Sequence, residues 1–175
     1  MMRAMRGLGS VKGLALVQPL ADLDELQKRD DQRLKSWARQ VGEERAQEAL
    51  AVLRSPQPNS QGRNGGAYTL PELLAESWLR KRSVRHEAQF DLGWARPDFV
   101  LFDLGATAGG CMVWEIQGEY WHKSSGAHDA ARKQRLLAST ARGLPILAVV
   151  EVWEADIYQG EGVFDAAASG RGMRG

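Results

Sequence analysis

Two acidic residues stand where carboxylates are rare, at the start of one apolar run and inside another. Asp98 directly precedes the apolar residues 99–102, and Glu115 is enclosed by apolar residues at 112–114 and 116. A carboxylate is costly to bury without compensation. If the two runs pair as antiparallel strands, their carboxylates repel unless one is protonated or a cation is shared. Two carboxylates, a backbone carbonyl and waters suffice for Mg²⁺. The alternative is that both residues merely fill edge-strand or loop positions.

The residues around these carboxylates follow a recognisable order. Arg96-Pro97-Asp98 is followed by Glu115-Ile116-Gln117. Further along come Gly118-Glu-Tyr-Trp-His122, Asp129-x-x-Arg132, Gly143-x-x-Ile146-Leu147 and Val152-Trp-Glu-Ala-Asp156-Ile157. The series, from about Thr69 to Tyr158, resembles the PD-(D/E)xK nuclease superfamily and, within it, the very-short-patch-repair-like branch. Gln117 departs from both patterns, because the superfamily usually has lysine there and the branch more often has aspartate.

The resemblance implies a metal-dependent DNA endonuclease that hydrolyses phosphodiester bonds. In that assignment Asp98 and Glu115 bind Mg²⁺, for which Mn²⁺ can substitute, and the main-chain carbonyl of Ile116 joins them. Such a cation makes a bound water a better nucleophile and offsets charge on the scissile phosphate. Gln117 hydrogen-bonds a water or a phosphate oxygen but supplies no charge.

The resemblance also assigns roles outside the strands. An acidic residue on the first core helix is expected at the site; Glu72 aligns best, with Glu76 one turn later as the second choice. His122 follows the strand by a short turn. It is either an acid, a base or a phosphate ligand near neutral pH, or a hydrogen-bonded loop residue.

Two groups of basic residues are candidates for contact with DNA. The resemblance suggests that Arg132 or Lys133 touches phosphate, whereas a simple ion pair of Arg132 with the acidic residue three positions earlier is the alternative. The run Arg80-Lys81-Arg82 either binds DNA phosphates through charge or forms the solvated end of a helix. DNA is therefore the expected partner.

The pattern of elements around these residues predicts an α/β fold. The segment Thr69-Leu-Pro-Glu72 is a capping box at the start of a helix. The expected elements are a helix at 69–82, strands at 85–92, 97–104 and 111–117, a hairpin loop at 105–110, a helix at 128–142 that stops at Gly143, and a strand at 146–152. This α-β-β-β-α-β order gives a mixed sheet with helices on its faces. A restriction-endonuclease-like core implies the same order.

A charged amphipathic helical segment precedes this core. Residues 20–54 lack proline and place apolar side chains on one stripe, with Gly42 as the expected break. This helix either packs on its own domain or docks a protein partner or a second copy. The other expected regions are a flexible, partner-ordered or targeting arm at 1–19, a linker at 55–68, the nuclease-like domain at 69–165 and a loose tail at 166–175.

The composition excludes several classes of protein. Of 175 residues 43% are apolar, and 23 basic against 22 acidic residues leave a formal charge of +1, which argues against a highly basic nucleic-acid wrapper. The single cysteine, Cys111, rules out an internal disulfide framework and a multi-thiolate zinc site. Because no apolar run is long enough to span a bilayer, we expect no membrane partner. The expected compartment is cytoplasmic, or the virion if the protein is phage-encoded.

The sequence leaves two functions of different kinds open. The first is the DNA endonuclease. The second is a nuclease-fold structural or DNA-binding component of a larger assembly without catalysis, for example a phage head–tail or packaging complex. Asp98, Glu115 and a helix glutamate favour the first, whereas Gln117 and the near-neutral charge favour the second. A small-molecule α/β enzyme is a weaker third, because the sequence has no phosphate-cradling glycine loop or nucleophile motif.

Overall fold

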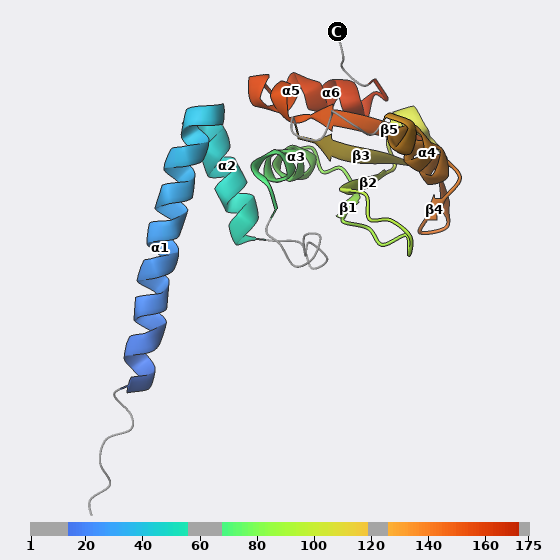
Figure 1. Cartoon of the computed structure of the whole chain (residues 1–175). Coiled ribbons are helices and arrows are strands. Elements are labelled where there is room, and N and C mark those ends of the chain that lie inside the picture. Colours follow the sequence, from blue (N-terminus) through green and yellow to red (C-terminus); the bar gives the residue numbers. More distant parts are fainter. Residues whose placement is uncertain (1–13, 56–67, 119–125, 172–175) are drawn as a thin grey trace, which may run out of the picture.

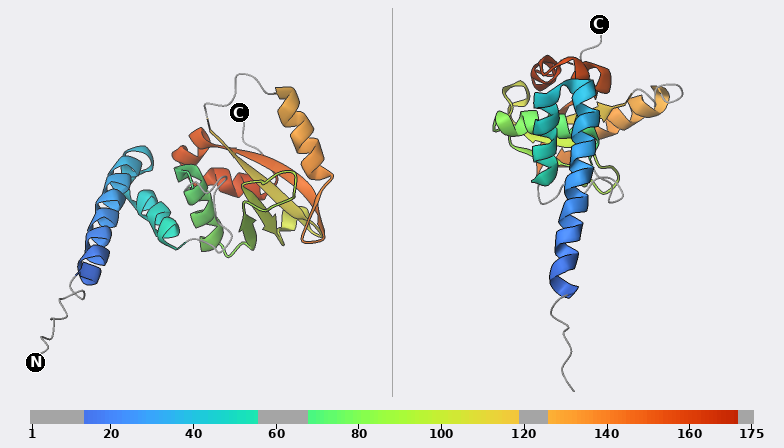
Figure 2. Two further views of the ribbon diagram at one scale, coloured as in Figure 1. Left: turned by 60° about the horizontal axis from the view of Figure 1, so that its bottom comes forward. Right: turned by 90° about the vertical axis from the view of Figure 1, so that its left-hand side faces the viewer.

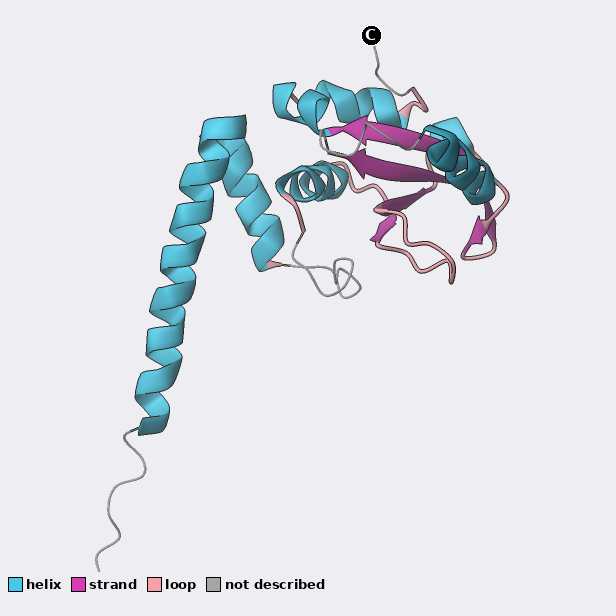
Figure 3. Cartoon of the chain, in the orientation of Figure 1, coloured by secondary structure: helices cyan, strands magenta, loops and turns pink. Residues whose placement is uncertain are grey.

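The computed structural model describes residues 14–55, 68–118 and 126–171 of the chain. Within these ranges it has six α-helices, a short 3₁₀ helix and five strands in one mixed sheet (Figure 1). Figure 3 shows the strands gathered in one part of the molecule, while the two N-terminal helices stand beside it. The α/β class predicted from the sequence is confirmed.

Two N-terminal helices are followed by helices and strands that alternate as expected. In chain order they are α1 (Leu14–Val41), α2 (Glu43–Arg54), α3 (Leu70–Lys81), β1 (His86–Ala88), β2 (Phe99–Phe102), the 3₁₀ helix (Gly105–Thr107), β3 (Cys111–Gln117), α4 (Gly126–Leu137), β4 (Thr140–Ala141), β5 (Leu144–Trp153), α5 (Glu154–Gln159) and α6 (Gly162–Ala168). Apart from the short 3₁₀ helix and the two-residue β4, the stretch from α3 to β5 follows the predicted α-β-β-β-α-β order.

The strand order across the sheet is β1-β2-β3-β5-β4. β1, β2 and β3 form an antiparallel meander, and β4 forms a hairpin with β5. β3 and β5 run parallel, which requires a long crossover connection between them. α4 lies in that connection.

Two hydrophobic clusters cover the two faces of the sheet. The first joins the sheet to α3, α5 and α6, and in it the rings of Trp78, Trp114 and Phe164 lie 5.6–5.8 Å apart. The second joins the other face to α4 through Leu136. Figure 2 shows α4 apart from α3 and α6. Because side chains alternate between the faces of a strand, Trp114 enters the first cluster while Glu115 lies on the α4 face.

α1 and α2 form a helical hairpin beside the sheet (Figures 1 and 2). Gly42 separates them with a φ of +85°, as the sequence predicted. α2 contributes Ala49 and Val52 to the cluster around α3. Arg45 on α2 donates a 2.6 Å hydrogen bond to the carbonyl of Ile157 on α5. α2 therefore packs on its own domain.

The first half of α1 extends beyond α2. α1 has 28 residues and α2 has 12. Arg54 at the end of α2 bonds Asp30 at 3.1 Å, which marks how far α2 reaches along α1. Before that point, Leu23 and Leu26 are 58% and 45% exposed, so a docking role stays open for this half.

Within the described part of the chain, no helix combines the length and apolar character that crossing a membrane requires.

The end of α4 differs from the sequence-based expectation. α4 stops at Leu137 instead of Arg142, and Gly143 is not its C-terminal glycine. Arg142 and Gly143, with φ of +52° and +77°, form the turn between β4 and β5. Two consecutive positive φ values are typical of a type I′ hairpin turn. The prediction was wrong because a glycine after a helical run fits a helix end and a hairpin turn equally well.

Two further boundaries also shift. β1 covers only 86–88, because residues 89–98 form a loop in which Asp91 accepts the N–H of Gly93 at 2.7 Å. α6 runs to Ala168 and buries Ala167, so the tail expected from residue 166 begins later. Most of the arm predicted at 1–19 and of the linker predicted at 55–68 lies outside the described residues, although α1 already begins at Leu14.

Candidate active site

Asp98 directly precedes β2, and Glu115 lies on the neighbouring strand β3. Phe99 lies opposite Trp114 in the β2–β3 ladder, so the next position along the ladder places Asp98 opposite Glu115. Directly opposite residues of antiparallel strands have Cβ atoms about 4.5–5.5 Å apart. The two residues are 8% and 7% exposed. The β2–β3 hairpin thus brings together the two acidic residues that the sequence singled out.

Hydrogen bonds from Ile116 and Gln89 help to hold the Asp98 carboxylate. Its Oδ2 accepts the backbone N–H of Ile116 at 2.7 Å, and its Oδ1 accepts the side-chain amide N–H of Gln89 at 3.1 Å. Oε1 of the same Gln89 amide is buried, and it has no hydrogen-bond partner among the described residues. An acceptor oxygen without a donor therefore lies next to Asp98.

The Glu115 carboxylate is paired with an arginine of α4. Nη2 of Arg132 donates to Oε1 of Glu115 at 2.8 Å, and the two side chains are 34% and 9% exposed. Sequence reasoning missed this ion pair because the residues belong to different elements, 17 positions apart. The pair places a cation directly beside the two carboxylates.

A third acidic residue, Glu151, lies beside Glu115 in the parallel β3–β5 register. The signal that could have revealed it was a charged residue inside the apolar run at 146–152. The three acidic residues do not make a three-ligand cluster. Within the described ranges, no group of three or more His, Cys, Asp or Glu side chains could hold a metal ion.

The remaining motif residues lie at the end of β3 or after it. Gln117 is the last residue of the strand, two positions after Glu115, and so lies on the same face of the sheet. His122 lies outside the described residues, so its role as an acid, a base or a phosphate ligand stays a prediction.

Glu72 caps the start of α3. Its Oε2 accepts the backbone N–H of Thr69 at 2.6 Å and the Thr69 hydroxyl at 2.9 Å, which confirms the predicted capping box. α3 packs on the sheet face opposite to α4. Within the described residues Glu72 joins no three-ligand group with Asp98 and Glu115. These contacts show that Glu72 caps α3, and its role at the site stays a prediction.

Glu76, the second choice on this helix, belongs to a buried charge network. It accepts hydrogen bonds from Nε of Arg80 at 2.7 Å and Nε2 of His86 at 2.9 Å, while Nδ1 of His86 lies 2.7 Å from the carbonyl of Val84. Both ring nitrogens of His86 face acceptors, which indicates an imidazolium.

The pKa values of this network follow from burial and pairing. Burial raises the pKa of Glu76, but the hydrogen bonds and charges of His86 and Arg80 outweigh it and leave the pKa below its usual value. Burial lowers the pKa of His86, yet its bonds to Glu76 and Val84 leave that pKa raised. Pairing therefore favours the charged forms of both Glu76 and His86.

The basic run at 80–82 connects helices through ion pairs. These pairs are Arg80–Glu76 at 2.7 Å, Lys81–Glu48, Lys81–Glu161 at 3.0 Å and Arg82–Asp165 at 3.2 Å. Arg82 also lies over the ring of Trp78 at 4.4 Å. These contacts tie α2, α3 and α6 together, and contact of the run with DNA stays a prediction.

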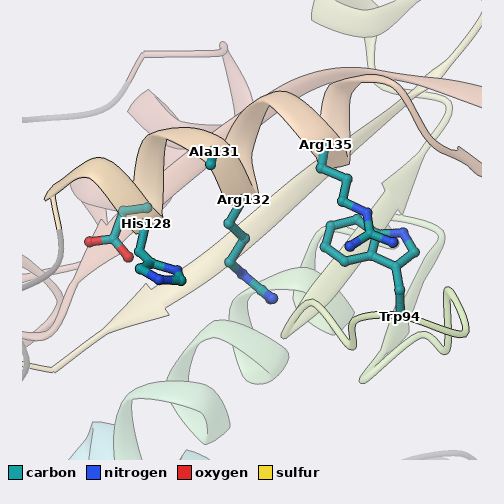
Figure 4. Close-up of a pocket in the computed structure, with 6 residues that line it drawn as sticks. Trp94, His128, Ala131, Arg132 and Arg135 are labelled. Carbon is teal, nitrogen blue, oxygen red and sulfur yellow. The ribbon is translucent and has the colours of Figure 1, made fainter.

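A basic pocket opens beside Glu115, between α4 and the loop at 89–98. Its volume is about 390 Å³, and its lining residues are Trp94, His128, Asp129, Ala131, Arg132 and Arg135. Figure 4 shows His128, Arg132 and Arg135 projecting from one side of α4. The guanidinium carbon of Arg135 lies 4.1 Å from the ring centroid of Trp94.

The sequence pointed to only part of this pocket. It singled out Arg132 but missed Trp94 and Arg135, although positions 128, 132 and 135 are spaced to share one helix face. Lys133, the other expected phosphate contact, is exposed and does not line the pocket.

Comparisons of the chain with protein-family models, with curated proteins and with solved structures found no match. The site consists of two buried carboxylates, Asp98 and Glu115, next to a pocket lined by His128, Arg132 and Arg135.

Proposed function

We propose that this chain is a metal-dependent DNA endonuclease with a restriction-endonuclease-like core of the PD-(D/E)xK type. The observation that carries the proposal is the juxtaposition of Asp98, directly before β2, and Glu115 on β3, on the sheet face that also holds Gln117. The α-β-β-β-α-β order and the basic pocket beside Glu115 support it. So does the order of motif residues in the sequence.

The oxygen donors at this site fit Mg²⁺ or Mn²⁺. Mg²⁺ prefers oxygen ligands and keeps several waters, so it needs few ligands from the protein. Asp98 and Glu115 would supply carboxylates and Ile116 a main-chain carbonyl; the buried, unpartnered Oε1 of Gln89 is a further acceptor beside Asp98. When bound, such an ion lowers the pKa of a water and offsets charge on the phosphate.

The protein's own side chains bind and orient the substrate. The donors of Ile116 and Gln89 hold the Asp98 carboxylate in place. Gln117 donates a hydrogen bond to a water or a phosphate oxygen at the end of β3. Arg132, beside Glu115, supplies the positive charge that the usual lysine of the motif would supply.

Cleavage of plasmid and short duplex DNA with Mg²⁺ or Mn²⁺ tests the proposal. Asp98→Asn and Glu115→Gln preserve shape but remove a negative charge, and each should lower the cleavage rate by at least about 10². Glu87→Gln is the matched control, because Glu87 lies on the same sheet but binds Arg142 at 2.8 Å. It should cleave like the parent.

Two outcomes would contradict the proposal. The first is that the parent protein does not cleave DNA in the presence of either Mg²⁺ or Mn²⁺. The second is cleavage of equal rate in the parent and in both site variants, which indicates a contaminating nuclease.

A second candidate function is favoured by the exposed half of α1. Exposed apolar patches mark interaction sites, and Leu23 and Leu26 are exposed on this helix. The chain would then be a non-catalytic, nuclease-fold component of a larger assembly that docks through α1. This candidate predicts no cleavage with any divalent ion, so the same assay separates the two functions.

A further inference from the structure

Arg132 takes part in two features of the α4 face. Its Nη2 bonds Glu115, and the same side chain lines the basic pocket. A guanidinium carries five N–H donors in a planar fork. About a third of the Arg132 side chain stays exposed in spite of the ion pair (34%). Arg132 can therefore present donors to a ligand in the pocket.

The other walls of the pocket also suit an anion. Arg135 is held over Trp94, which positions its charge at one end of the pocket, and His128 lies on the same side of α4 (Figure 4). Asp129 is the one acidic residue among the six that line the pocket. The arrangement offers several donors to one group that carries acceptor oxygens.

The loop that carries Trp94 is itself held in shape. Asp91 accepts the N–H of Gly93 at 2.7 Å and a hydrogen bond from Arg96 at 2.9 Å. The backbone N–H of Leu92 donates to the carbonyl of Ala95 at 3.0 Å. The pocket wall opposite α4 is therefore formed before any ligand arrives, which lowers the cost of ordering it on binding.

We infer that this pocket binds one phosphate of the DNA backbone, and that Arg132 is shared between this phosphate and Glu115. The inference rests on the proposed function. Phosphate and Glu115 are both anions and compete for one guanidinium, so loss of the Glu115 charge strengthens the phosphate contact. By reciprocity, a phosphate that engages Arg132 frees Glu115 for a divalent cation. Binding of DNA thereby prepares the carboxylate pair.

The affinity for DNA in the absence of divalent cations tests this inference. Binding of a fluorescently labelled duplex to the full-length chain is measured by anisotropy in EDTA, at several salt concentrations. Glu115→Gln should raise the affinity about fivefold, the size of a modest coupling between two sites. It should also steepen the log–log salt dependence by about 0.9, which corresponds to one additional phosphate contact.

A double-mutant cycle assigns this effect to Arg132. In the Arg132→Gln background, Glu115→Gln should change the affinity by less than about twofold. Lys133→Gln is the matched control, because Lys133 is an exposed neighbour on the same helix that does not line the pocket. Its effect should be the same with and without Glu115→Gln. Arg132→Lys, which keeps a charge, serves as a second variant if Arg132→Gln does not fold.

Three results would overturn the inference. Glu115→Gln could leave the cation-free affinity unchanged or lower it, which would show that Glu115 only positions Arg132. It could raise the affinity equally in the Arg132→Gln background, which would show a general charge effect. Inorganic phosphate could raise the melting temperature of the parent but not of Arg132→Gln, while Arg132→Gln binds DNA as tightly as the parent. The pocket would then be a site for free phosphate. In each case, Mg²⁺-dependent cleavage of DNA by the parent protein would still support the proposed function. Absence of cleavage by the parent protein would contradict that function independently of this inference.

Discussion

The buried network around Glu76 allows a quantitative prediction for the variant Glu76→Gln. Glu76 is 1% exposed and accepts charge-assisted hydrogen bonds from Arg80 and His86 at 2.7 and 2.9 Å. A hydrogen bond to a charged group contributes about 1.5–3 kcal/mol. The amide keeps one acceptor oxygen and turns its own N–H donors toward a cationic donor. We therefore expect the free energy of unfolding to fall by about 2–4 kcal/mol near pH 6.

The decrease in the free energy of unfolding caused by Glu76→Gln should depend on pH, and the pKa shifts of Glu76 and His86 set the direction of that dependence. The pKa of His86 is raised from 6.5, so the stability it contributes is complete below pH 6.5 and disappears as pH rises through the raised value. The pKa of Glu76 is lowered from 4.5, so its contribution is complete above pH 4.5 and disappears as pH falls through the lowered value. The difference in the free energy of unfolding between parent and variant is thus largest between pH 4.5 and pH 6.5. Above the folded pKa of His86 it shrinks to the contribution of Arg80.

Thermal unfolding followed by circular dichroism, at pH steps from about 5 to about 9, measures this difference. For a chain of this size 1 kcal/mol corresponds to about 2–4 °C, so Glu76→Gln should lower the melting temperature by about 5–15 °C near pH 6. Glu72→Gln is the matched control on the same helix. It weakens a capping box and should cost about 0.5 kcal/mol, with little change across this pH range. A loss for Glu76→Gln that is independent of pH, or no larger than the control, would refute the reasoning.

Three further predictions concern stability in urea. Gly110→Ala should cost about 1–3 kcal/mol, because a Cβ there would lie 2.5 Å from the carbonyl oxygen of Pro145; an unchanged midpoint would show that the β2–β3 loop yields easily. Arg45→Gln should cost about 1–3 kcal/mol, because it removes the 2.6 Å bond from α2 to the carbonyl of Ile157, and a loss below this range would mean that α2 is held by apolar contacts alone. Lys81→Gln should cost less than about 1 kcal/mol, since its side chain is 40% exposed, and a larger loss would contradict the weak contribution assigned to its pairs.

Elements with strong local signals were predicted well. The capping box of Thr69 and Glu72 starts α3 where expected, and β3 covers the predicted residues 111–117. The break at Gly42 likewise follows from a local conformational requirement, a positive φ. Each of these features depends on residues close in the sequence, so the sequence by itself is sufficient to locate them.

Elements with ambiguous local signals were predicted less well. The residues before Gly143 fit the end of a helix, but they form β4 because β5 offers Thr140 and Ala141 partners for backbone pairing. The run predicted as one strand at 85–92 shortens to three residues because the loop at 89–98 folds back on itself. Long-range pairing decides both cases.

The sequence by itself determined which residues are chemically unusual in this protein. Asp98 and Glu115 stand out because a carboxylate in an apolar run is costly, and that cost is visible without any tertiary contact. Only the tertiary structure decided what surrounds them. Arg132 reaches Glu115 because α4 packs on one particular face of the sheet, and Glu151 adjoins Glu115 because β5 pairs with β3 in one particular register. Packing and register depend on side chains far apart in the chain acting together, so no local pattern specifies them.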